Sequence, residues 1–265
     1  MALCSETPRL DAELLLAHCL GKPRSYLYSW PERLLAPEIR TQFQQLINRR
    51  MKPTPIAYLL GQREFFSLDF KTTPAALIPR SETELLVETV LDLYPANAAI
   101  RVLELGTGTG AISVALKKNR PGLDLLATDL SPDCLALARE NAERHAVSID
   151  WLLSDWYSNI NPARIFDVIV SNPPYIAADS CFLLQGDLPA EPRTALSPGD
   201  SGLEALQQII AGASTYLKPS GYLLLEHGFD QSVQVDKLMK THGFTEIECK
   251  IDLNDLPRMS LGKLI

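Results

Sequence analysis

The stretch "VLELGTGTGA", from Val102 to Ala111, runs from an apolar segment through a glycine-rich turn into the start of a helical pattern. Glycines between a strand and a helix let the backbone approach a ligand at the helix N-terminus. Gly106, Gly108 and Ala111 also satisfy the G-x-G-x-x-A pattern of dinucleotide-binding turns. The pattern alone leaves two interpretations open, a ligand-binding turn and a tight strand-to-helix turn that binds nothing.

Strand and helix patterns alternate around this turn, from Ser81 to the end of the chain. The predicted strands are "IRVLEL", "LDLLATD", "IDWLLSD", "FDVIVSN", "GYLLLEH", "FTEIECK" and the short terminal "LGKLI". The helices predicted between them are "AISVALKKN", "PDCLALARENAERH", "SGLEALQQIIAGASTYL" and "QSVQVDKLMKTH". This repeated order predicts an α/β fold, with a parallel sheet that carries helices on both faces.

The chain divides into three predicted parts, residues 1–60, 61–79 and 80–265. Apolar residues at helical spacing predict a small helical unit in the first part: Leu10, Leu14, Ala17, Leu20, Ile39, Phe43, Leu46 and Ile47. Apolar residues that alternate with polar ones predict a strand of a linking hairpin in the second part: Phe66, Leu68 and Phe70. The third part holds the alternating strands and helices.

Two serines precede predicted helices of this third part. In "SETE", Ser81 and Glu84 have the spacing of a capping box, which predicts a helix that begins at Ser81. Ser131 precedes Pro132 at the start of the helix "PDCLALARENAERH" and is predicted to cap it. Both predictions use only residues close together in the chain.

The composition of the chain narrows the class of partner. Hydrophobic residues make up 46% of the 265 residues and charged residues 22%, which is typical of a globular protein. The net charge of −7 makes broad electrostatic attraction to a nucleic-acid backbone unfavourable, so we expect no direct DNA binding. The N-terminus lacks a signal-peptide core, and no apolar run approaches the length of a membrane span.

Cysteine and histidine usage indicates a reducing compartment and no metal. The five cysteines are scattered and never spaced as C-x-x-C, which favours reduced thiols over disulfides. The four histidines show no spacing typical of metal ligands. We therefore expect a cytoplasmic protein without a bound metal.

Acidic residues follow the strands next to the glycine-rich turn. Asp129 ends the second strand, about 20 residues after the glycine-rich turn. At this spacing in the sequence, a carboxylate accepts hydrogen bonds from a ribose, either of a nicotinamide cofactor or of S-adenosylmethionine. Asp155 and Trp156 end the third strand, where they can contact an adenine amino group and cover the base. An ordinary half-buried tryptophan remains an equal interpretation. Because ligands of open α/β sheets lie beyond the carboxyl ends of the strands, we expect these groups to converge on one crevice.

"SNPPY", from Ser171 to Tyr175, stops the buried strand "FDVIV" with two prolines that cannot continue a sheet. An amide or aryl amine is a poor nucleophile because its nitrogen lone pair is delocalised. If the side-chain oxygen of Asn172 and the carbonyl of Pro173 accept its two N–H groups, the positive charge that develops on nitrogen is stabilised. Tyr175 can stack on the planar group and orient it toward an electrophile. A hydride-transfer enzyme has no use for this arrangement.

Several polar residues keep two interpretations. Arg80 either lines the entrance of a substrate site or pairs with a surface carboxylate. Glu82 and Glu84 are interpreted as first-turn helix residues in preference to a catalytic pair. The basic run in the range 49–52 is interpreted as a solvated helix end. For His227, a structural hydrogen bond is preferred to a role at the ligand edge.

The motifs together resemble a known family. Asn-Pro-Pro-Tyr after the fourth strand and "ELGTGTGA" after the first resemble the Rossmann-like amino-methyltransferases. "PIAYLLGQREFFSLDF", "LIPRSETELLVE", "FDVIVSNPPYI", "EPRTALSPGDSGLEALQQII" and "LLLEHG" resemble the bacterial release factor glutamine methyltransferases nearly end to end. That family usually has Pro-Glu-Thr-Glu where this chain has Ser81 to Glu84.

The resemblance implies a fold, an activity and a set of site residues. The fold is a Rossmann-like class I methyltransferase with a mostly parallel seven-stranded sheet, a small N-terminal helical domain that helps to hold the release factor, and a linking β-hairpin. The activity transfers a methyl group from S-adenosylmethionine to the side-chain amide of the glutamine in the Gly-Gly-Gln loop of release factors. Expected cofactor-binding residues are Glu104, Gly106, Thr107, Gly108, Thr109, Gly110, Asp129, Asp155, Trp156 and Asn172. Expected catalytic and substrate-binding residues are Asn172, Pro173, Pro174 and Tyr175, with Arg80 added for substrate binding.

Two other functions compete with this one. An adenine-specific nucleic-acid methyltransferase would need to flip its base and bind flanking phosphates, and this acidic chain has no added basic recognition domain. A catalytically inactive adaptor that binds release factors or senses S-adenosylmethionine is disfavoured because every expected reactive position is filled.

Overall fold

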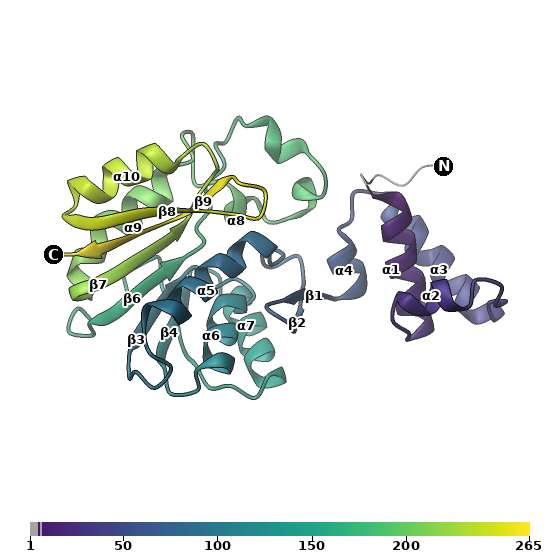
Figure 1. Cartoon of the computed structure of the whole chain (residues 1–265). Coiled ribbons are helices and arrows are strands. Elements are labelled where there is room, and N and C mark those ends of the chain that lie inside the picture. The colour runs from purple at the N-terminus through teal and green to yellow at the C-terminus, as the bar shows by residue number, and fades with distance from the viewer. Residues whose placement is uncertain (1–4, 6) are drawn as a thin grey trace.

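The N-terminal helices form a unit beside the rest of the molecule. The structure is a computed structural model that describes residue 5 and residues 7–265. Figure 1 shows the helices on one side of the sheet domain, with a hairpin between the two. They are α1 (Pro8–Leu20), α2 (Ser25–Ser29), α3 (Pro37–Arg50) and α4 (Ile56–Leu60). The helix α1 packs against α3 and α4. Of the apolar residues predicted to form its packed face, Ala17 is buried and the others are partly buried, and the most buried apolar side chain of α1 is the neighbouring Leu15.

The hairpin consists of β1 (Gln62–Phe65) and β2 (Leu68–Lys71), paired antiparallel. Phe66 and Ser67 form its turn with φ of 52° and 61°. The prediction of a strand that includes Phe66 is therefore wrong at that residue. Positive φ at both turn residues gives the backbone twist that matches the two strands, so the turn takes precedence over the apolar alternation.

A sheet of seven strands forms the centre of the molecule, in the order β5-β4-β3-β6-β7-β9-β8. Its strands are β3 (Arg101–Leu105), β4 (Asp124–Asp129), β5 (Asp150–Leu153), β6 (Phe166–Ser171), β7 (Leu217–Glu226), β8 (Phe244–Ile251) and β9 (Pro257–Leu264). The first five pair in parallel, whereas β9 runs antiparallel to both β7 and β8. The predicted mostly parallel seven-stranded sheet is confirmed.

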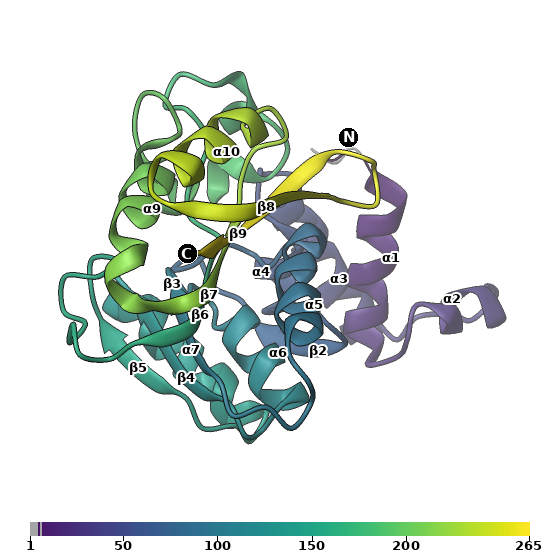
Figure 2. The same ribbon diagram turned by 60° about the vertical axis from the view of Figure 1, so that its left-hand side comes forward.

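Helices cover both faces of this sheet (Figure 2). They are α5 (Glu84–Leu93), α6 (Ala111–Asn119), α7 (Pro132–Arg144), α9 (Glu204–Tyr216) and α10 (Ser232–Thr241). Val102 packs in the core cluster with α5 and α6, and the next residue, Leu103, packs in the cluster with α9 and α10. The central strands are thus buried on both sides, which explains their continuous apolar sequence. None of the described helices has the length and apolar character needed to cross a membrane.

The two predicted helix caps have different outcomes. Ser131 precedes α7, and its side chain accepts a hydrogen bond from the N–H of Cys134, as predicted. Ser81 instead opens a short 3₁₀ helix, η1 (Ser81–Thr83), that leads into α5, and it caps no N–H within residues 7–265. The predicted capping box is wrong because the carboxylate of Glu84 accepts from the N–H of Phe66 at 2.8 Å, in the hairpin turn. A contact between distant segments has replaced the local one.

A long connection between β6 and α9 holds three short helices that the sequence did not predict. We call residues 172–203 the β6–α9 loop. Its helices are η2 (Cys181–Leu184), η3 (Leu188–Ala190) and α8 (Arg193–Leu196). The loop begins with the Asn-Pro-Pro-Tyr motif, so its position decides what surrounds that motif.

Candidate active site

The carboxyl ends of three neighbouring strands bring separate segments to one edge of the sheet. Asp129 ends β4, Gly106 follows β3 and Asn172 follows β6. One cavity, of about 280 Å³, lies beside residues 106–109, and we call it the glycine-turn cavity. A second, of about 560 Å³, lies beside residues 172–175, and we call it the NPPY cavity. The residues that line both are Leu77, Arg80, Asn172, Pro174 and Ala195.

Most residues expected to bind a cofactor line the glycine-turn cavity. They are Glu104, Gly106, Thr107, Gly108, Thr109, Asp129, Asp155, Trp156 and Asn172. Gly110 lies outside this lining, at the start of α6, with φ of 81°. A Cβ added there would lie only 3.0 Å from the Cβ of Ala138. The absence of a side chain at Gly110 therefore allows α6 and α7 to pack closely.

The glycine turn and a tryptophan ring border the same space. Gly106 and Gly108 have φ of 71° and 55°, in the left-handed region that favours glycine. A Cβ on Gly106 would lie 3.5 Å from a ring carbon of Trp156. The same ring packs against the core cluster under α9. Trp156 is thus the half-buried tryptophan of one interpretation and also lines the cavity, while its contact with an adenine base stays a prediction.

Two carboxylates, buried Glu104 and half-buried Asp129, lie behind the turn. Glu104 is 1% exposed, and its Oε2 accepts from the hydroxyl of Thr107 at 2.8 Å, from the N–H of Ser113 at 3.1 Å and from the Ser113 hydroxyl. Burial raises the pKa of Glu104 to about 7. Asp129 accepts from the N–H groups of Gly108 at 2.8 Å and of Ser131 at 2.9 Å, and burial raises its pKa. These bonds hold the turn against the end of β4.

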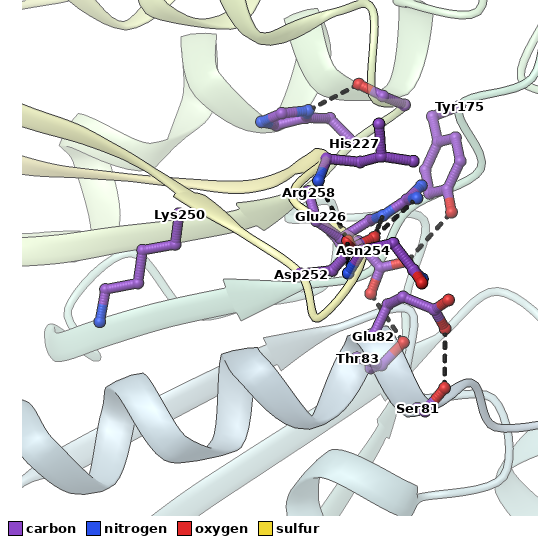
Figure 3. Close-up of polar contacts among 12 residues, drawn as sticks. Ser81, Glu82, Thr83, Tyr175, Glu226, His227, Lys250, Asp252, Asn254 and Arg258 are labelled. Atoms are coloured by element: carbon purple, nitrogen blue, oxygen red, sulfur yellow. Dashed lines mark hydrogen bonds and ion pairs between the residues drawn. The ribbon is translucent and has the colours of Figure 1, made fainter.

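Asn172 is held by a chain of hydrogen bonds where the two cavities meet. Its Nδ2 donates to the hydroxyl of Thr83 at 2.9 Å, and that hydroxyl donates to Oε2 of Glu226 at 2.7 Å. The phenol of Tyr175 donates to the other oxygen, Oε1, at 3.0 Å. Figure 3 shows Thr83 and Tyr175 pointing toward Glu226 from two different segments of the chain. Burial, followed by the charge of Glu226, raises the pKa of Tyr175.

Sequence reasoning missed Glu226 as a site residue. It ends β7, directly beside β6, is 1% exposed, and lines the NPPY cavity. Burial raises its pKa to about 7. Its signal was present in "LLLEHG", where a carboxylate follows an apolar strand at the edge of the sheet that binds ligands. Arg258, to which the sequence assigned no role, lines the same cavity and pairs with Asp252 at 3.0 Å.

Comparison with known proteins was made for the whole chain. Residues 2–61 match the PrmC N-terminal domain, and residues 81–199 match the Methyltransferase small domain. The release factor glutamine methyltransferase of Shewanella oneidensis is 43% identical over 99% of this chain and 92% of its own. That of Burkholderia pseudomallei is 44% identical over 96% and 92%. The chain belongs to the release factor glutamine methyltransferase family. The resemblance seen in its sequence is therefore confirmed.

A solved structure supports the fold. The catalytic domain of hMettl16, in complex with MAT2A 3′UTR hairpin 6, superposes with a TM-score of 0.63 at 18% identity. The match covers 79% of this chain and 81% of that one. It shows that this family member shares a methyltransferase fold with more distant proteins.

In this family member, ion pairs tie the β6–α9 loop to segments that lie far away in the sequence. Glu191 accepts from the N–H of Ile78 at 2.9 Å and from the guanidinium of Arg80. Arg50 donates to Asp187 of the loop at 2.6 Å and to Asp11 of α1 at 2.8 Å. Arg80 lines the cavity and pairs with Glu191, which is buried and is therefore not the surface carboxylate considered from the sequence. A role of Arg80 at a substrate entrance stays a prediction.

The interpretation of the basic run as a solvated helix end is wrong for one residue. Arg49 is exposed, but Arg50 is only 4% exposed and also donates to the carbonyl of Thr54 at 2.9 Å. Buried guanidinium groups need paired carboxylates, and these came from segments far away in the sequence. Arg50 therefore joins the N-terminal helices to the β6–α9 loop.

The backbone carbonyl of Tyr175 contacts two residues that lie outside the Asn-Pro-Pro-Tyr motif. Gln231 donates to its carbonyl at 2.9 Å. A Cβ added to Gly202, whose φ is 75°, would lie only 2.6 Å from the same carbonyl oxygen. The glycine in "SPGDSGLEAL" therefore allows the end of the β6–α9 loop to pack directly on the motif at its beginning.

His227 has the structural role that the sequence favoured. It is buried, with Nε2 2.9 Å from the hydroxyl of Ser260 and Nδ1 2.9 Å from the carbonyl of Gly228. Burial lowers its pKa. Across residue 5 and residues 7–265, no group of three or more His, Cys, Asp or Glu residues is arranged to hold a metal ion.

Proposed function

We propose that this chain transfers the methyl group of S-adenosylmethionine to the side-chain amide nitrogen of the glutamine in the Gly-Gly-Gln motif of peptide-chain release factors. Support comes from membership of a family whose named relatives are release factor glutamine methyltransferases. The observation that carries the proposal is the position of Asn172, which lines both cavities. An amide held at Asn172 lies next to a site for a methyl donor. Such a substrate implies activity in the cytoplasm.

The glycine-turn cavity has the chemistry to hold the cofactor. Asp129 accepts one N–H at each oxygen, which leaves lone pairs for the hydroxyls of a ribose. Oε1 of Glu104 accepts no hydrogen bond from the described residues, so it is available to a charged donor such as the cofactor's ammonium group. Asp155 and Trp156 lie at the side where an adenine base would be covered. When bound, the cofactor supplies an electrophilic methyl carbon.

The NPPY cavity has the chemistry to hold the substrate amide. The side-chain oxygen of Asn172 and the carbonyl of Pro173 would accept the two N–H groups of the glutamine side chain. Positive charge that develops on the nitrogen is then stabilised by two acceptors that the prolines keep rigid. Tyr175 would stack on the planar amide and hold its nitrogen toward the glycine-turn cavity. Transfer would leave S-adenosylhomocysteine as the second product, and loss of one proton from the nitrogen would give the N-methyl amide.

We also propose that the N-terminal helices, in residues 1–60, help to dock the release factor. The residues expected to bind the cofactor all lie after this region, and Arg50 links the region to the loop over the NPPY cavity. The docking unit would therefore influence protein binding and leave cofactor binding intact. We expect no direct contact with DNA, because the chain carries a net charge of −7.

Labelled S-adenosylmethionine tests the proposal when incubated with the purified protein and a release factor. Label is expected in the release factor, on a single glutamine identified by mass spectrometry. A release factor with that glutamine changed to alanine is the matched control and should stay unlabelled. Label that persists in this control, or that enters DNA and no protein, would refute the proposed substrate.

A further inference from the structure

The amide of Asn172 can serve as an acceptor in only one of its two orientations. Its oxygen and its NH₂ group have nearly the same shape, so the side chain fits equally well when turned by 180°. In one orientation the oxygen can accept an N–H from a substrate amide. In the other orientation, the NH₂ group of Asn172 faces the NH₂ group of the substrate amide, and two hydrogen-bond donors cannot bind each other. Methyl transfer as proposed above therefore requires a neighbouring group that distinguishes the oxygen of the Asn172 side chain from its NH₂ group.

Thr83 makes this distinction through its single proton. The hydroxyl of Thr83 donates to Oε2 of Glu226 at 2.7 Å, so its oxygen can only accept from Asn172. Asn172 accordingly presents Nδ2 to Thr83, at 2.9 Å. Oδ1 of Asn172 accepts no hydrogen bond from the described residues, and the side chain lines both cavities. The hydroxyl thus directs the amide oxygen away from itself.

Glu226 in turn sets the direction of the Thr83 proton. An ionised carboxylate only accepts hydrogen bonds, and Glu226 accepts one at each oxygen, from Thr83 and from Tyr175. Figure 3 shows the two donors on either side of this carboxylate, with Thr83 at the start of the helix that leads into α5. While Glu226 is ionised, the hydrogen bonds can therefore run in one direction only, with Asn172 donating to Thr83 and Thr83 donating to Glu226.

We propose that Thr83 and Glu226 are positioning residues that hold the Asn172 amide with its oxygen toward the substrate. The inference rests on the proposed glutamine methylation and deepens it, since it names the residues that make Asn172 an acceptor. Neither residue needs to touch the reacting nitrogen.

Protonation of Glu226 removes this polarity. A neutral carboxyl group can donate to the oxygen of Thr83, which frees the Thr83 proton for Asn172 and favours the opposite amide orientation. Burial and, to a smaller extent, the carboxylate of Glu82 raise the pKa of Glu226, and the net result of all its surroundings is a pKa of about 7. Arg258 and the hydroxyls of Thr83 and Tyr175 lower it. His227 follows Glu226 in the chain, and burial lowers its pKa.

Substitutions at Thr83 test the inference against a purely structural role. Thr83→Val keeps the shape and removes the hydroxyl, and we expect kcat for release-factor methylation to fall by about 10-fold to 100-fold, the cost of a misoriented catalytic contact. Thr83→Ser keeps the hydroxyl and should restore most of the activity. Thr89→Val is the matched control, because Thr89 is buried on α5, the helix that follows Thr83, and accepts from Lys250 instead of donating to Glu226. Its kcat should equal that of the unchanged protein.

The pH profile of kcat provides a second readout. The unchanged protein should lose activity as the pH falls through about 7, because Glu226 takes up a proton. Glu226→Gln cannot titrate, so this acidic limb should disappear from its profile while calorimetry shows that S-adenosylmethionine still binds. If the unchanged protein methylates a release factor but Thr83→Val matches its kcat, or Glu226→Gln keeps the acidic limb, the positioning role is refuted. If the unchanged protein methylates no release factor, the proposed function itself fails.

Discussion

The two cavities meet at Asn172, but they are assembled from the sequence in different ways. Most residues of the glycine-turn cavity that are expected to bind a cofactor come from short segments at the ends of neighbouring strands, such as Gly106 after β3 and Asp129 at the end of β4. The NPPY cavity combines the motif with Glu226 and Arg258, from strands that lie beyond the β6–α9 loop in the chain. Thr83, which lines the glycine-turn cavity, connects Asn172 to Glu226 through hydrogen bonds. Local patterns therefore describe the first cavity well, whereas the second depends on contacts between distant segments.

The largest effect is expected at the junction of the two cavities. Asn172→Ala removes an acceptor that meets the nitrogen as charge develops, so kcat should fall on the order of 10² to 10³. Affinity for S-adenosylmethionine should change little, because Asp129 and Glu104 remain. Single-turnover methylation and calorimetric titration measure the two quantities. Asn119→Ala, on α6 and away from both cavities, is the control. If the variant binds cofactor poorly but transfers methyl normally at saturation, Asn172 belongs functionally to the glycine-turn cavity alone.

The next effect concerns the ion pairs that tie the β6–α9 loop to the N-terminal helices. Arg50→Met leaves the carboxylates of Asp11 and Asp187 without their partner, and we expect a loss of about 2 to 3 kcal/mol in the free energy of unfolding. The estimate lies below the range for fully buried pairs because Asp187 is partly exposed. KM for the release factor should rise, since the β6–α9 loop loses its link to the N-terminal helices.

Arg49→Met is the matched control for this change. Arg49 is the neighbouring residue of the same helix and is exposed, so its loss should leave stability and KM nearly unchanged. Urea denaturation and steady-state kinetics compare the two variants. Equal results for both would mean that the link between the N-terminal helices and the loop has no effect on substrate binding.

These outcomes reflect what the sequence could and could not predict. The alternation of strand and helix patterns along the chain predicted the elements of the sheet domain. Its central strands are buried on both faces, and this burial leaves continuous apolar runs that are visible in the local sequence. The partners of Arg50, Thr83 and Glu191 could not be predicted, since each lies on a segment remote in the chain. The turn at Phe66 was also missed, because its positive φ is not visible in the apolar alternation.

In the glycine-turn cavity, loss of the Asp129 carboxylate should lower the affinity for S-adenosylmethionine. Asp129→Ala removes an acceptor expected to hold the cofactor equally in the ground state and the transition state, so binding should weaken by about 1.5 to 3 kcal/mol. Turnover at saturating cofactor should suffer less than in Asn172→Ala. Asp133→Ala, an exposed residue of the first turn of α7, is the control. Unchanged calorimetric affinity for S-adenosylmethionine would contradict the proposed ribose contact.

The smallest effects are expected on stability, from substitutions of the two serines that were predicted to cap helices, Ser131 and Ser81. Ser131→Ala should lose about 1 kcal/mol of stability, because its side chain caps α7. Ser81→Pro should instead gain about 0.4 to 1 kcal/mol, since proline reduces the freedom of the unfolded chain. The N–H of Ser81 donates no hydrogen bond within the described residues, and Arg80 before it has φ of −104° and ψ of 145°, which suits a residue before proline. Ser81 also stands at the first position of its helix, where proline is favoured. Urea denaturation measures both variants, and a loss of stability in Ser81→Pro would mean that this segment needs its serine after all.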